Sequence, residues 1–268
     1  MNDLIHHIYT ELLNHIDQIN ELNVFPIPDK DTGTNIANTI KSLSGSTLKE
    51  ISNGVLLSAR GSSGNILAAF LIGAANSTSK NYHEICESGY KNIIQSLTGI
   101  KDGTLASSLH HTPQDYSNLK DFLLKYQDIL INDLLDSPNK NETLKKYNTV
   151  DSGILALIYI VNSILNYRYE VDKVSVETSI LMFQDRIKIR YCNEYLIKGR
   201  LNGFKKNLLS ALGNEILIIS HSGNTKVHIH SNYPKVIYYL LKKKTLNYKI
   251  EDMHDFNRKL NIKELGRK

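Results

Sequence analysis

The first two-thirds of the chain carry apolar residues at the spacing of amphipathic helices. Between Leu4 and Ile19 these residues recur every three or four positions, which places them on one face of a predicted helix. Later segments repeat this pattern or carry an unbroken apolar run. The other helices predicted in this part of the chain span 36–43, 66–75, 85–96, 119–135 and 153–166.

After about Tyr169 the apolar residues begin to alternate with polar ones, as in half-buried strands. Two helical patterns interrupt the strand-like runs, and the resulting order is β-α-β-β-α-β. This order is typical of a split β-α-β, or ferredoxin-like, domain. The predicted strands span 187–197, 215–220, 225–231 and 246–253, and the predicted helices span 199–212 and 233–243.

The change of pattern predicts two domains of different class, an all-α helical bundle followed by a smaller α+β domain. We place the helical domain at 1–170 and the ferredoxin-like domain at 171–260, with a polar tail at 261–268 that is expected to fray. A chain of 268 residues is long enough for two such domains.

Composition excludes several classes of protein. Apolar residues make up 41% of the chain and charged residues 22%, which excludes a wholly disordered protein. The excess of 32 Lys and Arg over 27 Asp and Glu is mild. Basic runs such as Lys242–Lys244 are short and are typical of a solvated helix face. We therefore expect no nucleic-acid partner.

The two cysteines, Cys86 and Cys192, are too few for a disulfide framework. The N-terminus lacks the basic and apolar regions of a signal peptide, and the longest apolar stretches are too short to span a bilayer. These features predict a cytoplasmic protein without stable membrane insertion.

An aspartate-rich loop is the first sign of chemistry. Residues 23–35 contain two prolines, a glycine and clustered Asx and Thr residues, which predict an ordered loop. Asp29 and Asp31 can converge on one hard cation such as Mg²⁺, and the N–H groups of the following helix suit a phosphate. The alternative is an Asx-rich turn in which Thr34 and Asn35 cap the helix that begins near residue 36.

A glycine- and serine-rich segment, 58–65, precedes a buried apolar run. Glycines allow the backbone to approach a ligand, and a helix N-terminus favours phosphate. The segment matches neither the P-loop nor the dinucleotide fingerprint. Arg60 is expected to pair with a phosphate or with a nearby carboxylate. Two further segments, 102–104 and 151–153, read as loops that start helices.

Cys192, His228 and His230 suggest a metal site in the second domain. The two histidines are one residue apart on a predicted strand, so both side chains point to the same face. The first and third strands are neighbours in a ferredoxin-like sheet, which brings Cys192 close to them. These three residues predict a zinc site with an open fourth position, whereas the alternative is a buried cysteine and two surface histidines. His221 and His254 are further candidate ligands.

Six segments, in order along the chain, resemble the ATP-binding subunit of bacterial fatty acid kinase. The longest reads NVFPIPDKDTGTN at 23–35, where the family has NVFPVPDGDTGTN. Residues 59–67 read ARGSSGNIL beside the family's ARGNSGVIL. The other four are DGTL at 102–105, VDSG at 150–153, YCNEYL at 191–196 and KVHIHSN at 226–232, beside EGTIL, VDAGG, YCTEFL and KVHVHTN.

The resemblance implies a barrel-like helical bundle, similar to the nucleotide-binding L subunit of dihydroxyacetone kinase. Asp29, Asp31 and Arg60 form the implied catalytic group, with Mg²⁺ held by the two aspartates between the phosphates of ATP. Zn²⁺ is implied at the Cys192, His228 and His230 cluster. The residues implied for the nucleotide and phosphate site are Thr32, Thr34, Asn35, Ser62, Ser63, Gly64 and Thr104.

The implied reaction transfers the γ-phosphate of ATP to a fatty acid and yields acyl phosphate and ADP. In the resembled family a separate fatty-acid-binding carrier protein presents the carboxylate. Because this carboxylate is already a nucleophile, the reaction needs positioning and charge neutralisation more than a general base. Zinc is expected to orient the carrier or polarise the carboxylate. A homodimer through the first domain is also implied.

Two features differ from the resembled family. Lys30 stands where the motif has glycine, and a lysine there contacts phosphate or, at positive φ, is strained. The chain also ends soon after the second domain, whereas family members usually continue into a third domain like the carrier's fold. These differences are compatible with a minimal kinase, a regulatory paralogue or a part of a longer chain.

Two other functions fit the same residues. A non-catalytic adaptor that binds nucleotide or metal and the carrier is favoured by Lys30 and the short C-terminus. The retained aspartates and the Cys/His set argue against it. A kinase for a small hydroxy-ketone or polyol is the second alternative, and in such an enzyme the second domain would have no place.

Overall fold

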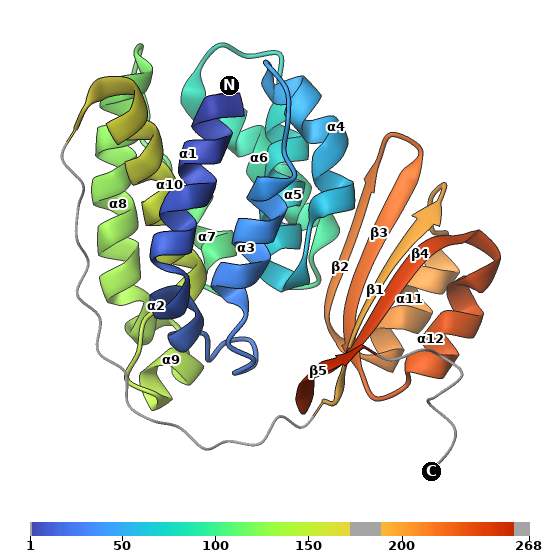
Figure 1. Cartoon of the computed structure of the whole chain (residues 1–268). Helices are drawn as coiled ribbons and strands as arrows, with labels where there is room; N and C mark the ends of the chain where they lie inside the picture. The colour runs from blue at the N-terminus through green and yellow to red at the C-terminus, as the bar shows by residue number, and fades with distance from the viewer. Residues whose placement is uncertain (1, 172–188, 260–268) are drawn as a thin grey trace. The chain divides into compact units, whose positions relative to one another are not determined.

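A computed structural model describes residues 2–171 and 189–259, which form two compact units (Figure 1). Among the described residues, the first unit comprises 2–95 and 99–171, and the second comprises 96–98 and 189–259. The expected strand residues 187 and 188 and the expected tail, 261–268, lie outside the described residues. No described helix combines the length and the apolar character that crossing a bilayer requires.

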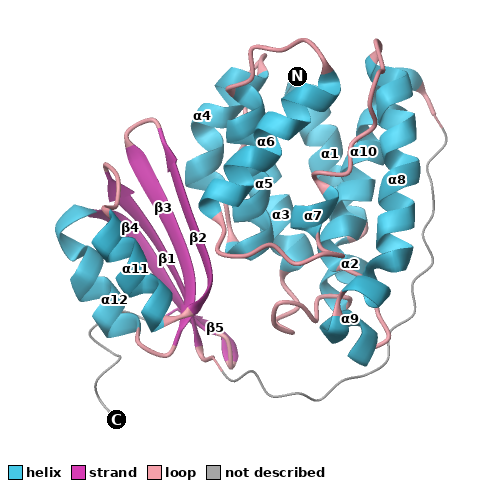
Figure 2. Ribbon diagram, turned by 180° about the vertical axis from the view of Figure 1, so that it is seen from behind, coloured by secondary structure: helices cyan, strands magenta, loops and turns pink. Residues whose placement is uncertain are grey.

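The first unit is all-α, as predicted (Figure 2). Its centre is α10, which is buried along most of its length by α1, α2, α3, α7 and α8. A helix that is apolar around its whole circumference takes such a central position. The helices are α1 Asn2–Asn14, α2 Ile16–Glu21, α3 Thr32–Lys41, α4 Leu48–Ser58, α5 Gly61–Ala75, α6 Tyr82–Ser96, α7 Leu105–Ser108, α8 Leu119–Lys140, α9 Glu142–Lys146 and α10 Ser152–Tyr169.

Several helix boundaries differ from the prediction. The single helix expected over 4–19 is interrupted at His15, which separates α1 from α2. The helix expected from residue 36 begins at Thr32, so Thr34 and Asn35 lie inside its first turn and do not cap it. Helices α4 and α9 were not predicted, because they are short or lack a clear apolar period, whereas α7 follows the predicted helix start at 102–104.

The second unit has the predicted β-α-β-β-α-β order, with one additional strand. Its sheet is antiparallel with strand order β2-β3-β1-β4-β5, so the first and third strands are neighbours. The sequence did not reveal β5, because the turn at Met253–His254 lacks the Asn-Gly or Asp-Gly pair that signals a hairpin. The elements are β1 Tyr191–Lys198, α11 Gly203–Leu212, β2 Asn214–His221, β3 Asn224–Ser231, α12 Pro234–Leu241, the 3₁₀ turn Lys242–Lys244, β4 Thr245–Asp252 and β5 Asp255–Lys259.

The two faces of this sheet differ in chemistry. Side chains such as Tyr195, Val227 and Ile229 form the apolar core together with residues of α11 and α12. Successive side chains of a strand point to opposite faces, so Cys192 and Glu194 lie on the other face. Cys192 pairs with His230 and Glu194 pairs with His228 across the strands, and paired residues share a face. This polar face carries the residues of the predicted metal site.

Candidate functional site

Two asparagines organise the aspartate-rich loop and the start of α3. The Asn23 Oδ1 atom accepts hydrogen bonds from the backbone N–H groups of Asp31, at 2.9 Å, and Thr32, at 3.1 Å. The Asn20 Oδ1 atom accepts from the next two, Gly33 at 2.8 Å and Thr34 at 3.2 Å. The four amides at the start of α3 are therefore bound within the chain.

This arrangement corrects one expectation about the start of α3 and shows how the helix is capped. The amides at the start of α3 were expected to suit a phosphate, but Asn20 and Asn23 already occupy them. Asp31 is the N-cap residue of α3, yet its side chain makes no capping hydrogen bond. An aspartate at this position usually accepts from the second or third amide of the helix. Because the asparagines take that role, capping does not consume the Asp31 carboxylate.

Lys30, between the two aspartates, has a φ of 55°. A residue with a Cβ atom is strained in this left-handed region, whereas glycine is not. We expect Lys30→Gly to raise the free energy of unfolding by about 1 kcal/mol, as measured by urea denaturation. Lys30→Ala removes the same charge but keeps the Cβ atom, so it serves as the control. Equal stability of the two variants would contradict the strain.

The start of α5 lies against the start of α3, so two motifs about 30 residues apart in sequence meet. The Ser63 hydroxyl donates to the Thr32 hydroxyl at 3.4 Å. Gly61 has a φ of 56°, and a Cβ atom on it would lie 2.0 Å from the Asn35 side-chain nitrogen. A side chain at Gly64 would meet the Thr39 hydroxyl at 2.3 Å. Gly61 and Gly64 therefore permit the close approach of these helices.

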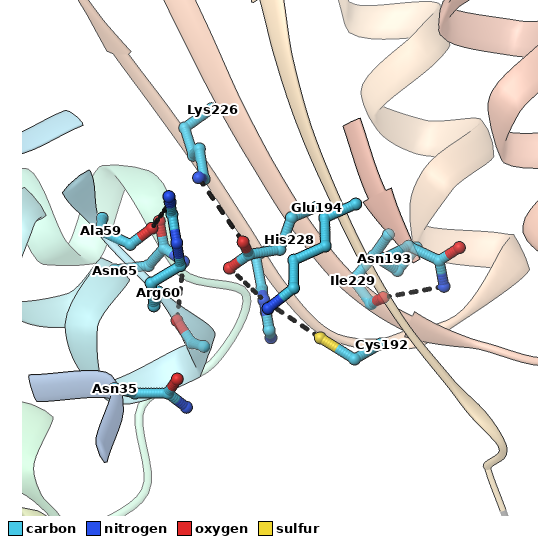
Figure 3. Close-up of polar contacts among 12 residues, drawn as sticks. Asn35, Ala59, Arg60, Asn65, Cys192, Asn193, Glu194, Lys226, His228 and Ile229 are labelled. Carbon is cyan, nitrogen blue, oxygen red and sulfur yellow. Dashed lines mark hydrogen bonds and ion pairs between the residues drawn. The ribbon is translucent and has the colours of Figure 1, made fainter. Parts of the chain in front are cut away.

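Arg60 precedes α5 and contacts the end of α4. Its Nη1 atom donates to the carbonyl oxygens of Leu57, at 3.1 Å, and Ala59, at 2.9 Å (Figure 3). These carbonyls lie at the C-terminal end of α4, where a positive charge is favoured. The described contacts thus join Arg60 to backbone carbonyls, and the expected pairing with a carboxylate is not among them.

Thr104 is buried in the loop before α7 and has structural hydrogen bonds. Its hydroxyl donates to the Lys101 carbonyl at 2.7 Å, and its N–H group donates to the Ser107 hydroxyl at 3.0 Å. The Lys101 ammonium lies 4.8 Å from the centre of the Phe25 ring. This cation–π contact places the Thr104 loop beside the aspartate-rich loop.

Asp151 joins two helix starts, a role that the sequence did not reveal. Its Oδ1 atom accepts from the N–H groups of Ile154, at 2.9 Å, and Leu105, at 3.1 Å. Burial raises the pKa of this carboxyl to about 6, although the backbone donors oppose the shift. The segment 151–153 predicted a helix start at α10. It could not predict the contact with Leu105, which is 46 positions away in sequence.

The raised pKa of Asp151 makes stability depend on pH. The pKa in the unfolded chain is near 3.9, so the folded state binds the proton more tightly, and stability falls as pH rises from about 4 to about 6. Asp151→Asn keeps the acceptor and removes the charge. We expect it to match the wild type near pH 4 and to exceed it by about 3 kcal/mol at pH 7. Denaturation curves of both proteins across this pH range measure the difference in free energy of unfolding. A difference that does not change with pH would contradict the assignment to Asp151.

Cys192, His228 and His230 come together on the polar face of the sheet. One potential ligand atom from each lies within 4.8 Å of the others. The Cys192 Sγ atom is 3.8 Å from the His228 Nδ1 atom (Figure 3). Within the described part of the chain, the buried His230 Nδ1 atom has no hydrogen-bond partner. Burial, and then the neighbouring His228, hold the pKa of His230 well below its usual value, so the ring is neutral, as a metal ligand must be.

Two buried charged residues adjoin this cluster and were not predicted. The Glu194 carboxylate lies 3.5 Å from the His228 Nδ1 atom and 3.6 Å from the Lys226 ammonium. Glu194 and Lys226 are each 5% exposed. In the strand register Glu194 lies opposite His228, and Lys226, two residues before His228, is its diagonal neighbour on the same face. Alternation along the strand beginning at Cys192 is the sequence signal that could have identified Glu194.

The other candidate histidines lie outside this cluster. His221 pairs with Asn224 at the turn between β2 and β3, four positions from Leu217, which pairs with His228. At about 3.4 Å per residue this is too far for a shared ion. His254 is exposed in the turn after β4, and neither histidine joins the Cys/His group.

Comparisons with known proteins agree with this two-part architecture. Residues 26–166 match the family model described as the DAK2 domain, and residues 188–260 match the model of the middle domain of FakA-like fatty acid kinase proteins. An uncharacterized protein of Staphylococcus epidermidis is 26% identical over 94% of this chain and 54% of its own length. An uncharacterized protein of Staphylococcus aureus is 24% identical over 94% and 55%.

The chain spans about half the length of the curated relatives that it matches. The DAK2 match alone covers more than half of the chain. The chain therefore belongs to the kinase-like DAK2-domain family and carries the middle domain of FakA-like fatty acid kinase proteins.

Proposed function

We propose that the chain is an ATP-dependent kinase subunit that phosphorylates a fatty acid presented by a separate lipid-binding protein. In this proposal residues 1–170 bind the nucleotide and residues 171–260 form the middle domain. One observation carries it: the start of α5 lies against the start of α3, so the Ser63 hydroxyl meets the Thr32 hydroxyl directly after the aspartate-rich loop. The middle-domain match supports a fatty acid as the acceptor.

Asp29 and Asp31 would hold Mg²⁺, because two carboxylates on an ordered loop suit a hard cation that also binds phosphate oxygens. The ion would neutralise charge on the transferring phosphoryl group. Around the loop, the Thr32 and Ser63 hydroxyls meet, and Asn35 packs against Gly61. We assign the phosphate and nucleotide site to Thr32, Thr34, Asn35, Ser62, Ser63, Gly64 and Thr104, with Arg60 beside it.

In the proposed reaction, a carboxylate oxygen of the fatty acid attacks the γ-phosphorus. The bond from this phosphorus to the bridging oxygen breaks, and ADP leaves with the electron pair. Because the carboxylate is already ionised, the chain needs to position the two reactants and neutralise charge. Thr32 and Ser63 offer hydroxyl donors at the meeting point of α3 and α5.

Cys192, His228 and His230 suit Zn²⁺. A thiolate and two neutral imidazoles are a common donor set, and the His230 Nδ1 atom is buried without a partner among the described residues. Two ligands of one tetrahedral zinc lie roughly 3.3–3.7 Å apart, close to the 3.8 Å between the Cys192 Sγ and His228 Nδ1 atoms. Bound zinc would supply a fixed positive charge, which the Glu194 carboxylate would partly balance.

The test is ADP release from ATP and Mg²⁺, with a fatty acid loaded on a lipid-binding protein, and trapping of acyl phosphate as the hydroxamate. Hydroxamate formed in proportion to ADP is the expected result. ADP release with dihydroxyacetone in place of the fatty acid would favour a polyol kinase. ATP binding without ADP release from any acceptor would favour the adaptor.

A further inference from the structure

One end of the second unit combines exposed apolar side chains with a high density of positive charge. At this end β1 finishes and β4 begins, since Ile197 pairs with Thr245. The helices meet there too, because the Lys205 ammonium donates to the Leu240 carbonyl at 2.7 Å. We call this region the basic end and define it by Lys198, Arg200, Phe204, Lys206, Tyr239, Lys242, Lys243, Lys244 and Leu246.

The charge of the basic end is unbalanced. No Asp or Glu occurs between residues 195 and 214 or between residues 216 and 250. Over the whole of 189–259 there are 13 Lys and Arg against 5 Asp and Glu, although the complete chain has 32 against 27. The positive charge of the protein is therefore concentrated in the second unit. The lysines at 242–244 are all exposed.

Three large apolar side chains project from the same end. Phe204 at the start of α11 is 73% exposed, Tyr239 near the end of α12 is 62% exposed, and Leu246 at the start of β4 is 56% exposed. The Lys242 ammonium lies 4.5 Å from the centre of the Tyr239 ring. Exposure of large apolar side chains to water is unfavourable. These three are grouped at one end and surrounded by lysines, which is typical of an interaction surface.

We propose that the basic end docks on the surface of an anionic lipid bilayer. Phe204, Tyr239 and Leu246 would enter the interfacial layer, and the surrounding lysines would lie at the level of the lipid phosphates. A bilayer surface has mobile anionic headgroups directly above an apolar layer. The lysines would therefore contact the headgroups while the apolar side chains leave water. The charge of the region is mostly lysine, which suits mobile headgroups, whereas ordered phosphates of nucleic acid favour the arginine fork.

This docking would be peripheral and would not insert a helix. It is independent of the proposed kinase activity, because it uses none of the residues assigned to ATP or metal. Each lysine near an anionic surface strengthens binding roughly fivefold, so the cluster would make association strong at low salt and weak at high salt.

Vesicle sedimentation of the full chain tests the proposal. We expect binding to vesicles that contain about 30 mol% phosphatidylglycerol and little binding to pure phosphatidylcholine. The double variant Lys242→Glu/Lys243→Glu is expected to weaken binding at least tenfold, and Phe204→Ser/Leu246→Ser about fivefold. Circular dichroism and thermal melting would verify that both variants fold.

Matched controls come from the first unit. Lys145→Glu/Lys146→Glu in α9 makes the same charge change at exposed positions, and Leu135→Ser in α8 removes a side chain that is 63% exposed. We expect both to bind as the wild type does. Equal binding of all variants, or equal binding to both vesicle types, would overturn the proposal. So would binding to a duplex oligonucleotide in the absence of vesicle binding, which would identify a nucleic-acid surface.

Discussion

Replacing Asp31 by asparagine is expected to lower the rate of ADP release at least about 100-fold. Asparagine is a good N-cap residue, and Asn20 and Asn23 hold the helix amides in either case, so α3 should remain intact. The substitution removes one of the two negative charges proposed to bind Mg²⁺. The rate loss should therefore be partly recovered at high Mg²⁺, which a structural defect would not show.

The measurement is kcat and KM for ATP as a function of Mg²⁺ concentration. Asp128→Asn is the matched control, because Asp128 is an exposed carboxylate on α8. Thermal melting of both variants should agree with the wild type within a few degrees. An Asp31→Asn protein with wild-type turnover would exclude Asp31 as a magnesium ligand, and Asp29→Asn would then test the neighbouring carboxylate of the loop.

Replacing His230 by alanine is expected to weaken zinc binding at least about 100-fold. Loss of a partner outside the ligand shell already costs between about 10-fold and 100-fold, and a direct ligand contributes more. His230 lies beside His228, with ring centres 4.7 Å apart, and its Nδ1 atom has no partner among the described residues. In the metal-free protein the substitution should therefore break no hydrogen bond of that atom.

Zinc content after dialysis, and competition with a chromophoric chelator, measure this loss without any activity assay. His221→Ala is the control, since His221 lies at the far end of β2. Glu194→Gln should give an intermediate loss, because it removes only the carboxylate beside His228. Full zinc content in His230→Ala would contradict the site. Full zinc content in Glu194→Gln would limit the role of Glu194 to pairing with Lys226.

Local patterns determined the order of the elements. An apolar period of two and then of three to four residues predicted β-α-β-β-α-β, and the observed strands differ from the prediction by only a few residues. From that order alone, the ferredoxin-like topology makes β1 and β3 neighbours. Cys192 was therefore expected to approach His228 and His230, and the observed register places it opposite His230.

Contacts between distant residues were beyond such reasoning. Asn20 and Asn23 are ordinary polar residues in sequence, and only the folded loop shows that they bind the amides at the start of α3. The same holds for Asp151, which accepts from the Leu105 amide 46 positions away. A side-chain amide or carboxylate can accept from any amide within reach, so spacing along the chain does not select its partner.

The sequence by itself thus determined two domains, their classes, and the residue types available for metal and phosphate. Tertiary structure decided how those residues are used: which amides are already bound, which carboxylate is not consumed by capping, and which charges gather at one end of the second unit. The physical reason is the distance along the chain over which each interaction acts. Period and turn chemistry act over a few residues, whereas hydrogen-bond partners and buried charges are set by packing between segments far apart in the chain.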